Sequence, residues 1–243
     1  MSALSPAAAA KPALQFNMQA VVLCYIFIVL PLFDMLNGFL IGQDYLAAGT
    51  LASPSQIGRF IAIILLFAYT AKFKYSPYLI LLFFWLFFLE GLFFFRHNNI
   101  SGVAIGYANV IRLLYMYLVF VAFKNLFAND FTTVIKFLKY NVMFICLSVV
   151  IASFTGLANS TYGWGAGTKG FFSSGNGLGI YIGVATLILA AMKKYRIYTN
   201  TPIVIFGLSA SALILLGTKT SFLMLLLVMF AGFWSGRLKI NQI

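Results

Sequence analysis

The sequence predicts an all-α membrane protein, a polytopic bundle of transmembrane helices. Three observations support this fold class. Hydrophobic residues make up 63% of the chain, and charged residues make up only 8%. Soluble domains carry about 25% charged residues, so the composition excludes an ordinary soluble domain. The apolar residues also form long continuous runs rather than short alternating segments, which favours helices over strands.

Eight apolar runs predict about eight membrane spans. A helix that crosses the hydrocarbon core, which is about 30 Å thick, needs roughly 20 apolar residues. The last two runs are short and a tight polar turn separates them, so they also fit a helical hairpin. Residues 1–18 are expected to form a flexible cytoplasmic tail, and residues 19–243 a single transmembrane helical domain. The spans are expected at residues 19–41, 57–71, 78–95, 102–123, 135–157, 175–191, 202–217 and 221–234.

The basic residues predict the orientation of the bundle. If the N-terminus is cytoplasmic, eleven Lys and Arg residues lie on the cytoplasmic side and four on the outer side. Such an excess of basic residues is typical of cytoplasmic loops. We therefore expect both termini to be cytoplasmic, in a bacterial cytoplasmic membrane, and the net charge of +12 to reflect orientation rather than binding to nucleic acid. The four outer residues are Arg59, Arg96, Lys169 and Lys219.

The sequence offers no signature of a metal site or a cofactor. Its two cysteines, Cys24 and Cys146, both fall inside expected spans, where they act as small hydrophobic residues. His97 is the single histidine, and neither CxxC nor HExxH occurs. We therefore expect no disulfide, no metal and no cofactor.

Three ionisable residues lie inside the expected spans: Asp34, Glu90 and Arg112. Each costs about 2.5–3.5 kcal/mol at a helix centre, so each needs a partner or water. Arg112 is expected to reach Glu90 on the adjoining helix and form a structural ion pair. Two interpretations of Asp34 stay open. In the first, Asp34 caps or hydrates the end of a helix that Pro31 breaks. In the second, Asp34 contacts a substrate.

Two stretches on the outer side resemble anion-binding helix starts. GTKTSFL, residues 217–223, makes the turn before the final span, and its hydroxyl side chains can cap the helix. TKGFFSSGNGLGIYIG, residues 168–183, opens an earlier span. Helix N-termini attract anions through their free N–H groups, and Lys169 and Lys219 would each add a positive charge. The alternative is structural. Lys219 sits in a tight turn, and the GxxxGxxxG spacing from Gly175 to Gly183 packs helices together.

The same two stretches carry a resemblance to a known family. KGFFSSGNGLGIYIGVATLILA, followed about thirty residues later by LLGTKTSFLMLLLVMF, resembles the O-antigen ligase and polysaccharide polymerase superfamily. The early LPLFDMLNGFL is similar to the first helix of its Gram-positive-type and exopolysaccharide branches. The residues that match the two family motifs are Phe172, Asn176 and Gly179, then Thr218, Lys219 and Thr220.

The resemblance implies a metal-independent, inverting glycosyl transfer outside the cytoplasmic membrane. The donor would be a glycan on undecaprenyl diphosphate, and the acceptor another lipid-linked sugar or a growing chain. Lys219 would contact the diphosphate and Asn176 would organise the neighbouring helix start. Charge and depth add Lys169 and Arg112 as substrate contacts. Family members carry further helices and a large outer loop with a histidine and an arginine. We therefore expect this chain to be the N-terminal part of the fold, and the alternative is a truncated homologue with an altered function. The general base is unknown.

Three other functions remain open from the sequence. The first is a transporter of a lipid-linked or anionic substrate, because transporters also aim helix ends at anions. The second is a non-catalytic subunit of an envelope complex. The third is a different membrane glycosyltransferase that uses Asp34 or Asp44. The sequence does not distinguish a ligase from a polymerase, and it does not name the sugars.

Overall fold

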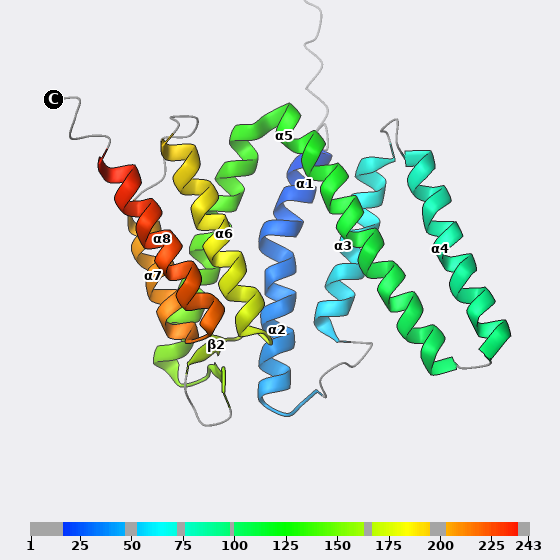
Figure 1. The fold of residues 1–243 in the computed structure, drawn as a ribbon, viewed down its shortest axis with the longest axis horizontal. Coiled ribbons are helices and arrows are strands. Elements are labelled where there is room, and N and C mark those ends of the chain that lie inside the picture. Colours follow the sequence, from blue (N-terminus) through cyan, green and yellow to red (C-terminus); the bar gives the residue numbers. More distant parts are fainter. Residues whose placement is uncertain are drawn as a thin grey trace, which may run out of the picture.

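The computed structural model describes residues 17–46, 53–71, 76–97, 100–162, 167–194 and 203–237, and the structural statements below concern these residues. Of the expected tail, residues 1–16 lie outside this part. Helices dominate the described chain, which confirms the all-α class (Figure 1). The helices are α1 (Met18–Cys24), the π-helix η1 (Tyr25–Val29), α2 (Leu30–Gly42), α3 (Pro54–Thr70), α4 (Ser76–His97), α5 (Ile100–Thr155), α6 (Gly175–Lys194), α7 (Val204–Leu216) and α8 (Lys219–Arg237). Two short antiparallel strands, β1 (Asn159–Ser160) and β2 (Thr168–Gly170), lie between α5 and α6.

The first rod runs continuously through α1, η1 and α2. Asn17 starts it, because its side-chain oxygen accepts a hydrogen bond of 3.1 Å from the backbone N–H of Gln19. The expected break at Pro31 does not occur, and the chain stays helical through this residue. Proline has no N–H to donate to the carbonyl four residues earlier, which belongs to Phe27. That carbonyl instead accepts a hydrogen bond from the side chain of Asn141 on α5. The π-helix and this distant donor therefore accommodate the proline.

Helix α5 consists of two arms that meet at a corner. Asp130 has φ −150° and ψ 74°, which are not helical values. Its carboxylate accepts a hydrogen bond of 3.0 Å from the backbone N–H of Thr133 and so caps the second arm. The two arms, residues 100–129 and 131–155, correspond to two of the expected spans, at 102–123 and 135–157.

Two ends of the bundle can be distinguished by their loops. We call the end that carries β1 and β2 the β end, and the end that carries the α5 corner the Asp130 end (Figure 1). Helices α6 and α8 both begin at the β end. Helix α7 ends there at Gly217, which has a left-handed φ of 65°. Thr218 is the only further residue before α8, so α7 and α8 form the helical hairpin that the sequence allowed.

Three helices are long and apolar enough to cross a membrane: Met18–Gly42, Asn109–Thr155 and Gly175–Lys193. These helices indicate a membrane protein. Helices also lie at the other apolar runs, but several are shorter, so the number of eight crossings stays a prediction. The shorter apolar helices are Pro54–Thr70, Val204–Leu216 and Lys219–Phe233.

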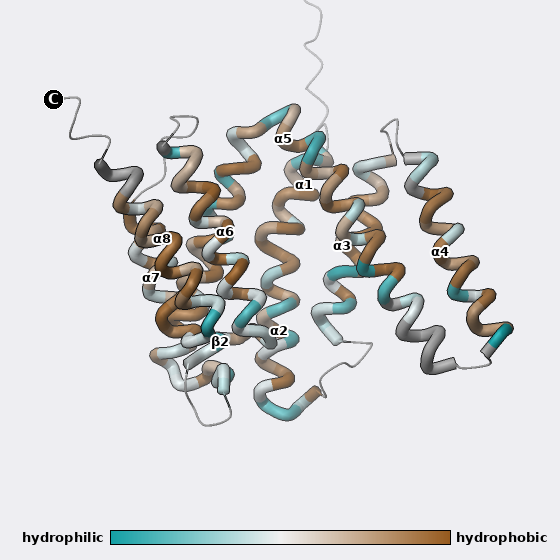
Figure 2. The backbone as a smooth tube through the Cα atoms, viewed as in Figure 1, coloured by the Kyte–Doolittle hydropathy of each residue, from teal (hydrophilic) through white to brown (hydrophobic). Residues whose placement is uncertain are grey.

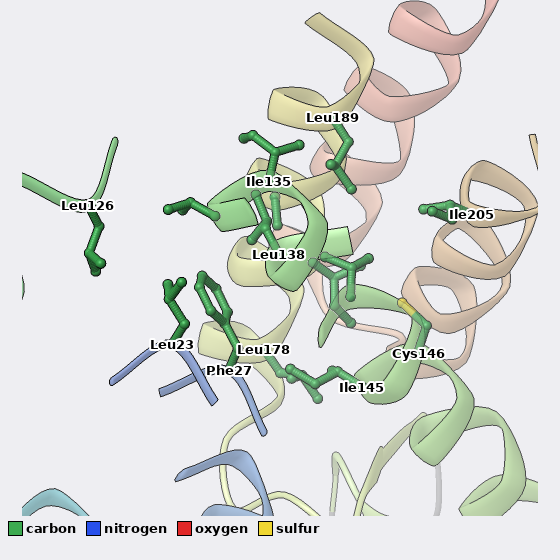
Figure 3. Close-up of a cluster of buried hydrophobic side chains, with 14 of the residues drawn as sticks. Leu23, Phe27, Leu126, Ile135, Leu138, Ile145, Cys146, Leu178, Leu189 and Ile205 are labelled. Atoms are coloured by element: carbon green, nitrogen blue, oxygen red, sulfur yellow. The ribbon is translucent and has the colours of Figure 1, made fainter. Parts of the chain in front are cut away.

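The core and the surface of the bundle are both apolar. Leu23 and Phe27 of the first rod pack with Leu138 of α5 and Leu178 of α6 in one buried cluster (Figure 3). Many large hydrophobic side chains are nevertheless exposed, and Phe154 keeps 85% of its surface accessible. Hydrophobic residues fill the middle of the helices, and hydrophilic residues gather mostly at their ends (Figure 2). A soluble monomer rarely exposes so much apolar surface, whereas a bilayer solvates it.

Candidate functional site

The two motifs singled out in the sequence meet at the β end. Helices α6 and α8 run in parallel, and their N-termini lie side by side. The hydroxyl of Thr220 donates a hydrogen bond of 3.1 Å to the side-chain oxygen of Asn176. Segments more than forty residues apart in sequence therefore form one surface, which we call the α6–α8 lip: residues 169–177 and 217–221.

Hydroxyl side chains cap both helices of the lip. The Thr218 oxygen accepts a hydrogen bond of 3.1 Å from the backbone N–H of Ser221, and the two hydroxyl oxygens are 2.6 Å apart. The Ser174 hydroxyl accepts a hydrogen bond of 3.4 Å from the N–H of Gly177. The expected capping role of Thr218 is confirmed. The first N–H groups of a helix have no partner within the helix, and they carry the positive end of its dipole. Both helices therefore present positive potential at the same place.

Glycines allow the two helices to approach this closely. A Cβ added at Gly179 would lie 2.3 Å from the Ser221 hydroxyl oxygen, and one added at Gly183 would lie 2.6 Å from Met224. Both distances are far shorter than van der Waals contact. The GxxxGxxxG spacing therefore serves helix packing, as the structural interpretation of the sequence predicted. The interface between α6 and α8 therefore accounts both for the close helix packing and for the position of the lip.

The structure places two of the predicted lysines at the lip. Lys169 lies on β2, and its ammonium donates a hydrogen bond of 3.4 Å to the Ser173 carbonyl. Its Cγ also lies 3.3 Å from the Cβ position of Gly175, the first residue of α6. Lys219 is the first residue of α8, and it is exposed. Lys169, Asn176 and Lys219 therefore belong to one surface.

The strands fix this surface to the rest of the bundle. The Thr161 hydroxyl donates a hydrogen bond of 2.8 Å to the Leu216 carbonyl at the end of α7. Asn159 donates a hydrogen bond of 2.7 Å to the Gly38 carbonyl of α2. The loop before α6 is thus held against α7 on one side and against α2 on the other.

Arg112 does not join the lip, and the predicted ion pair with Glu90 does not form. Arg112 is exposed on the first arm of α5 and donates a hydrogen bond of 3.2 Å to Asn109. Glu90 instead lies against Gly106, whose missing side chain leaves room for the carboxylate. Position 112 is six residues further along α5, or about 9 Å of helical rise. The prediction that Arg112 reaches Glu90 is therefore wrong, because this register separates the two charges.

Asp34 belongs to a bonded cluster with α3. It accepts a hydrogen bond of 2.5 Å from the Ser55 hydroxyl, and Arg59 lies 3.7 Å from the same carboxylate oxygen. The structure therefore replaces the predicted role at a broken helix end with a contact between α2 and α3. The second interpretation, contact with a substrate, stays open.

A cavity of about 620 Å³ opens beside Asp34, between the first rod, α3, α5 and α6. It is the principal feature that reasoning from the sequence did not predict. Asn141 lines it and links three elements. This buried amide donates to the Phe27 carbonyl of η1 and accepts from the Tyr181 hydroxyl of α6. An amide inside the apolar run 135–157 is a signal that could have revealed it, because buried polar groups need partners.

Metal binding finds no support in the described part of the chain, where no three His, Cys, Asp or Glu side chains come together. The expected independence from metals and cofactors stays a prediction. The side chain of His97 lies outside the described part of the structure, so the structure does not relate it to the lip. Comparison with known proteins finds no match among family models, curated proteins or solved structures.

Proposed function

We propose that the chain belongs to a membrane glycosyltransferase that takes a glycan from undecaprenyl diphosphate on the outer face of the bacterial cytoplasmic membrane. This is the activity of the O-antigen ligase and polysaccharide polymerase superfamily, which the sequence resembles. In this proposal the bundle crosses the membrane about eight times, both termini are cytoplasmic and the β end faces outward. The transfer needs no metal, and the acceptor is another glycan or lipid.

One observation carries the proposal. The two stretches that resemble the family motifs lie together, joined by the hydrogen bond between Thr220 and Asn176. Glycine packing brings the two helices together, and it places the polar residues of both motifs on one surface, where a single ligand can contact both. Lys169 and Lys219 flank the place where the two helix N-termini converge.

The chemistry of the lip suits a diphosphate. Two helix N-termini offer N–H donors and positive dipole ends, which bind phosphate groups. The two lysines add full positive charges, and ammonium groups bind phosphate as point charges. None of the four Asp and Glu residues of the chain lies within residues 169–177 or 217–221. A doubly phosphorylated lipid head group is therefore the ligand that this surface favours.

Binding of undecaprenyl diphosphate to the purified chain in nanodiscs tests the site. We expect Lys219→Gln to weaken binding at least about tenfold, which corresponds to about 1.4 kcal/mol. Lys136→Gln is the matched control, because Lys136 is also exposed but lies near the Asp130 end. Lys219→Arg should retain most of the affinity. Equal binding by Lys219→Gln and the parent chain would refute the diphosphate site.

Transfer is tested separately in vesicles that contain the chain, a glycan on undecaprenyl diphosphate and a fluorescent lipid-linked acceptor. A labelled product of higher mass is expected, and it should depend on Lys219. Binding without transfer would contradict the enzyme proposal for this chain.

The orientation has its own test. Single cysteines are placed at positions 169 and 136 in a chain with Cys24 and Cys146 replaced by alanine. A membrane-impermeant maleimide should label position 169 in intact cells and position 136 only after permeabilisation. The reverse pattern would invert the proposed topology.

A transporter of a lipid-linked or anionic substrate is the second candidate. The cavity of about 620 Å³ and the π-helix that borders it favour this function, because transporters build substrate sites at interrupted helices. A transporter would move undecaprenyl diphosphate across vesicle membranes without extending any glycan.

A further inference from the structure

The cavity beside Asp34 has a polar end and an apolar end. Asp34, Arg59, Ser173 and Ser174 line it near the β end, where α2 ends and where α3 and α6 begin. Phe127 and Val134, which lie on either side of the α5 corner, line the opposite end. The lining reaches along α6 from Gly177 to Ile188, eleven residues or about 16 Å of helical rise. The cavity is therefore long enough to hold a molecule with one chain and a small head group.

The apolar end is formed by hydrophobic side chains, and the Asn141 and Tyr181 side chains that also line the cavity are hydrogen-bonded to each other. The wall of the apolar end consists of Val119, Phe123, Phe127, Val134, Leu138 and Ile188. Binding sites for small molecules measure about 300–1,000 Å³ and combine mostly apolar walls with few polar groups, and this cavity fits both criteria. A hydrocarbon chain that enters this end would bury its apolar surface, which the hydrophobic effect favours.

The polar end favours an uncharged, hydroxyl-bearing head group. The Asp34 carboxylate would repel a phosphate, and the Arg59 guanidinium beside it would repel a cation. Both side chains remain accessible, with 37% and 43% of their surfaces exposed, so they can still contact a ligand. A carboxylate accepts hydrogen bonds from hydroxyls, and the Ser173 and Ser174 hydroxyls both donate and accept them. Sugar hydroxyls present both functions.

We propose that this cavity is a second binding site, adjacent to the α6–α8 lip, which holds a lipid-linked neutral sugar with its hydroxyls on Asp34. The apolar end holds the lipid chain. If the proposed function is correct, the ligand is the acceptor of the transfer, and this assignment alone rests on that function. Binding of the glycolipid does not depend on it.

The position of the cavity relative to the lip suits this division. The segment before α6 contributes to both sites: Ser173 and Ser174 line the cavity, and the Ser173 carbonyl accepts the hydrogen bond from Lys169. Within α6, Asn176 bonds to α8 on the lip side, whereas Gly177 lines the cavity. The N-terminus of α6 therefore has the proposed diphosphate site on its α8 side and the proposed sugar site on its cavity side.

The experiment uses the full chain in nanodiscs and an alkyl glucoside that carries a photoreactive diazirine in its chain. Irradiation should label peptides from the apolar end, identified by mass spectrometry. Unlabelled alkyl glucoside should compete, whereas glucose without a chain and an alkyl phosphate of the same length should not.

Asp34→Asn keeps the shape of the side chain and removes its charge. It should raise the half-saturating glucoside concentration at least about tenfold, as expected for a lost hydrogen bond to a charged group.

A blocking variant and two controls complete the test. Gly177→Leu should weaken labelling strongly, because a Cβ at Gly177 meets only the Ser174 hydroxyl, at 3.4 Å, and the longer side chain would occupy the polar end of the cavity beside Ser174. Gly207→Leu and Asp44→Asn should label like the parent chain, because neither residue lines the cavity. The inference is wrong if Asp34→Asn and Gly177→Leu label normally, or if the alkyl phosphate competes as well as the glucoside. Lys219→Gln should leave glucoside labelling unchanged, so this inference and the proposed function can fail independently.

Discussion

Thr220 and Asn176 form a hydrogen bond between two helix N-termini, with 3.1 Å between the hydroxyl and the side-chain oxygen. The bond uses the Asn176 oxygen as the acceptor. The amide NH₂ group of Asn176 then supplies two donors, so the same side chain can hold the helices together and bind an anion. These two roles can be separated by mutation.

Asn176→Asp should preserve the structure and impair anion binding. The new carboxylate still accepts the hydrogen bond from Thr220, and a negative charge at a helix N-terminus stabilises the helix by about 0.3–1 kcal/mol. The same charge repels a diphosphate and replaces the two amide donors. We expect an unchanged or slightly higher unfolding temperature in detergent, and undecaprenyl diphosphate binding at least about tenfold weaker. Binding like that of the parent chain would show that Asn176 has only the structural role.

Gly38 is predicted to be essential for packing of the β end against the first rod. A Cβ at this position would lie 2.1 Å from the Phe171 carbonyl oxygen, and this backbone atom cannot swing away as a side chain could. Gly38→Ala should therefore lower the free energy of unfolding by about 1–3 kcal/mol, the usual cost of overpacking. Gly207→Ala is the control, because a Cβ there meets nothing within 4 Å.

The control should even gain stability, since alanine in a helix is favoured over glycine by about 0.5–1 kcal/mol. Equilibrium unfolding of both variants in mixed micelles measures the difference. Equal stabilities would mean that the segment 171–173 does not press on α2 as described.

Substitution of the buried side chain of Asn141 should strongly lower the stability of the bundle. Asn141 is 2% exposed, and it satisfies both the Phe27 carbonyl and the Tyr181 hydroxyl. Asn141→Leu keeps the number and branching of the side-chain heavy atoms but leaves two polar groups without this partner. Each buried polar group left without a partner costs about 1–3 kcal/mol. The exposed hydroxyl of Ser211, bonded within its own helix to Gly207, provides the control variant Ser211→Ala.

We expect the unfolding temperature to be clearly lower for Asn141→Leu than for the parent chain, and nearly unchanged for Ser211→Ala. Because the Phe27 carbonyl depends on Asn141 where Pro31 removes a helical donor, Asn141→Leu combined with Pro31→Ala should recover part of the loss. A double variant no more stable than Asn141→Leu would contradict this account of the π-helix.

The helices could be predicted from the sequence, because each apolar run is long enough to define a helical segment by itself. The contact between α6 and α8 could be anticipated as well, since glycines at every fourth position form a smooth helix face. Thr218 was recognised as a cap from its place before an apolar run. These features depend on residues close together in the chain.

The interior of the bundle could not be predicted in the same way. Pro31 was expected to break its helix, but a donor 110 residues away compensates for the missing N–H, and no local pattern reveals such a donor. The cavity likewise depends on how the first rod, α3, α5 and α6 pack. The sequence places Glu90 and Arg112 on adjoining helices, but it does not determine the rotation of a helix or its register with a neighbour.

Glu90 and Arg112 therefore provide the sharpest difference between the sequence and the structure. If they formed the ion pair that the sequence predicts, exchanging the two charges in Glu90→Arg with Arg112→Glu would restore what each single variant loses. In the structure Glu90 fits against Gly106, and Arg112 bonds to Asn109. Arginine at position 90 would collide with α5, and the swap would rescue nothing. We expect a coupling energy below about 0.5 kcal/mol, the usual value for residues that do not touch. A double-mutant cycle on the free energy of unfolding measures it, and a coupling of 1 kcal/mol or more, as for contacting residues, would restore the ion pair.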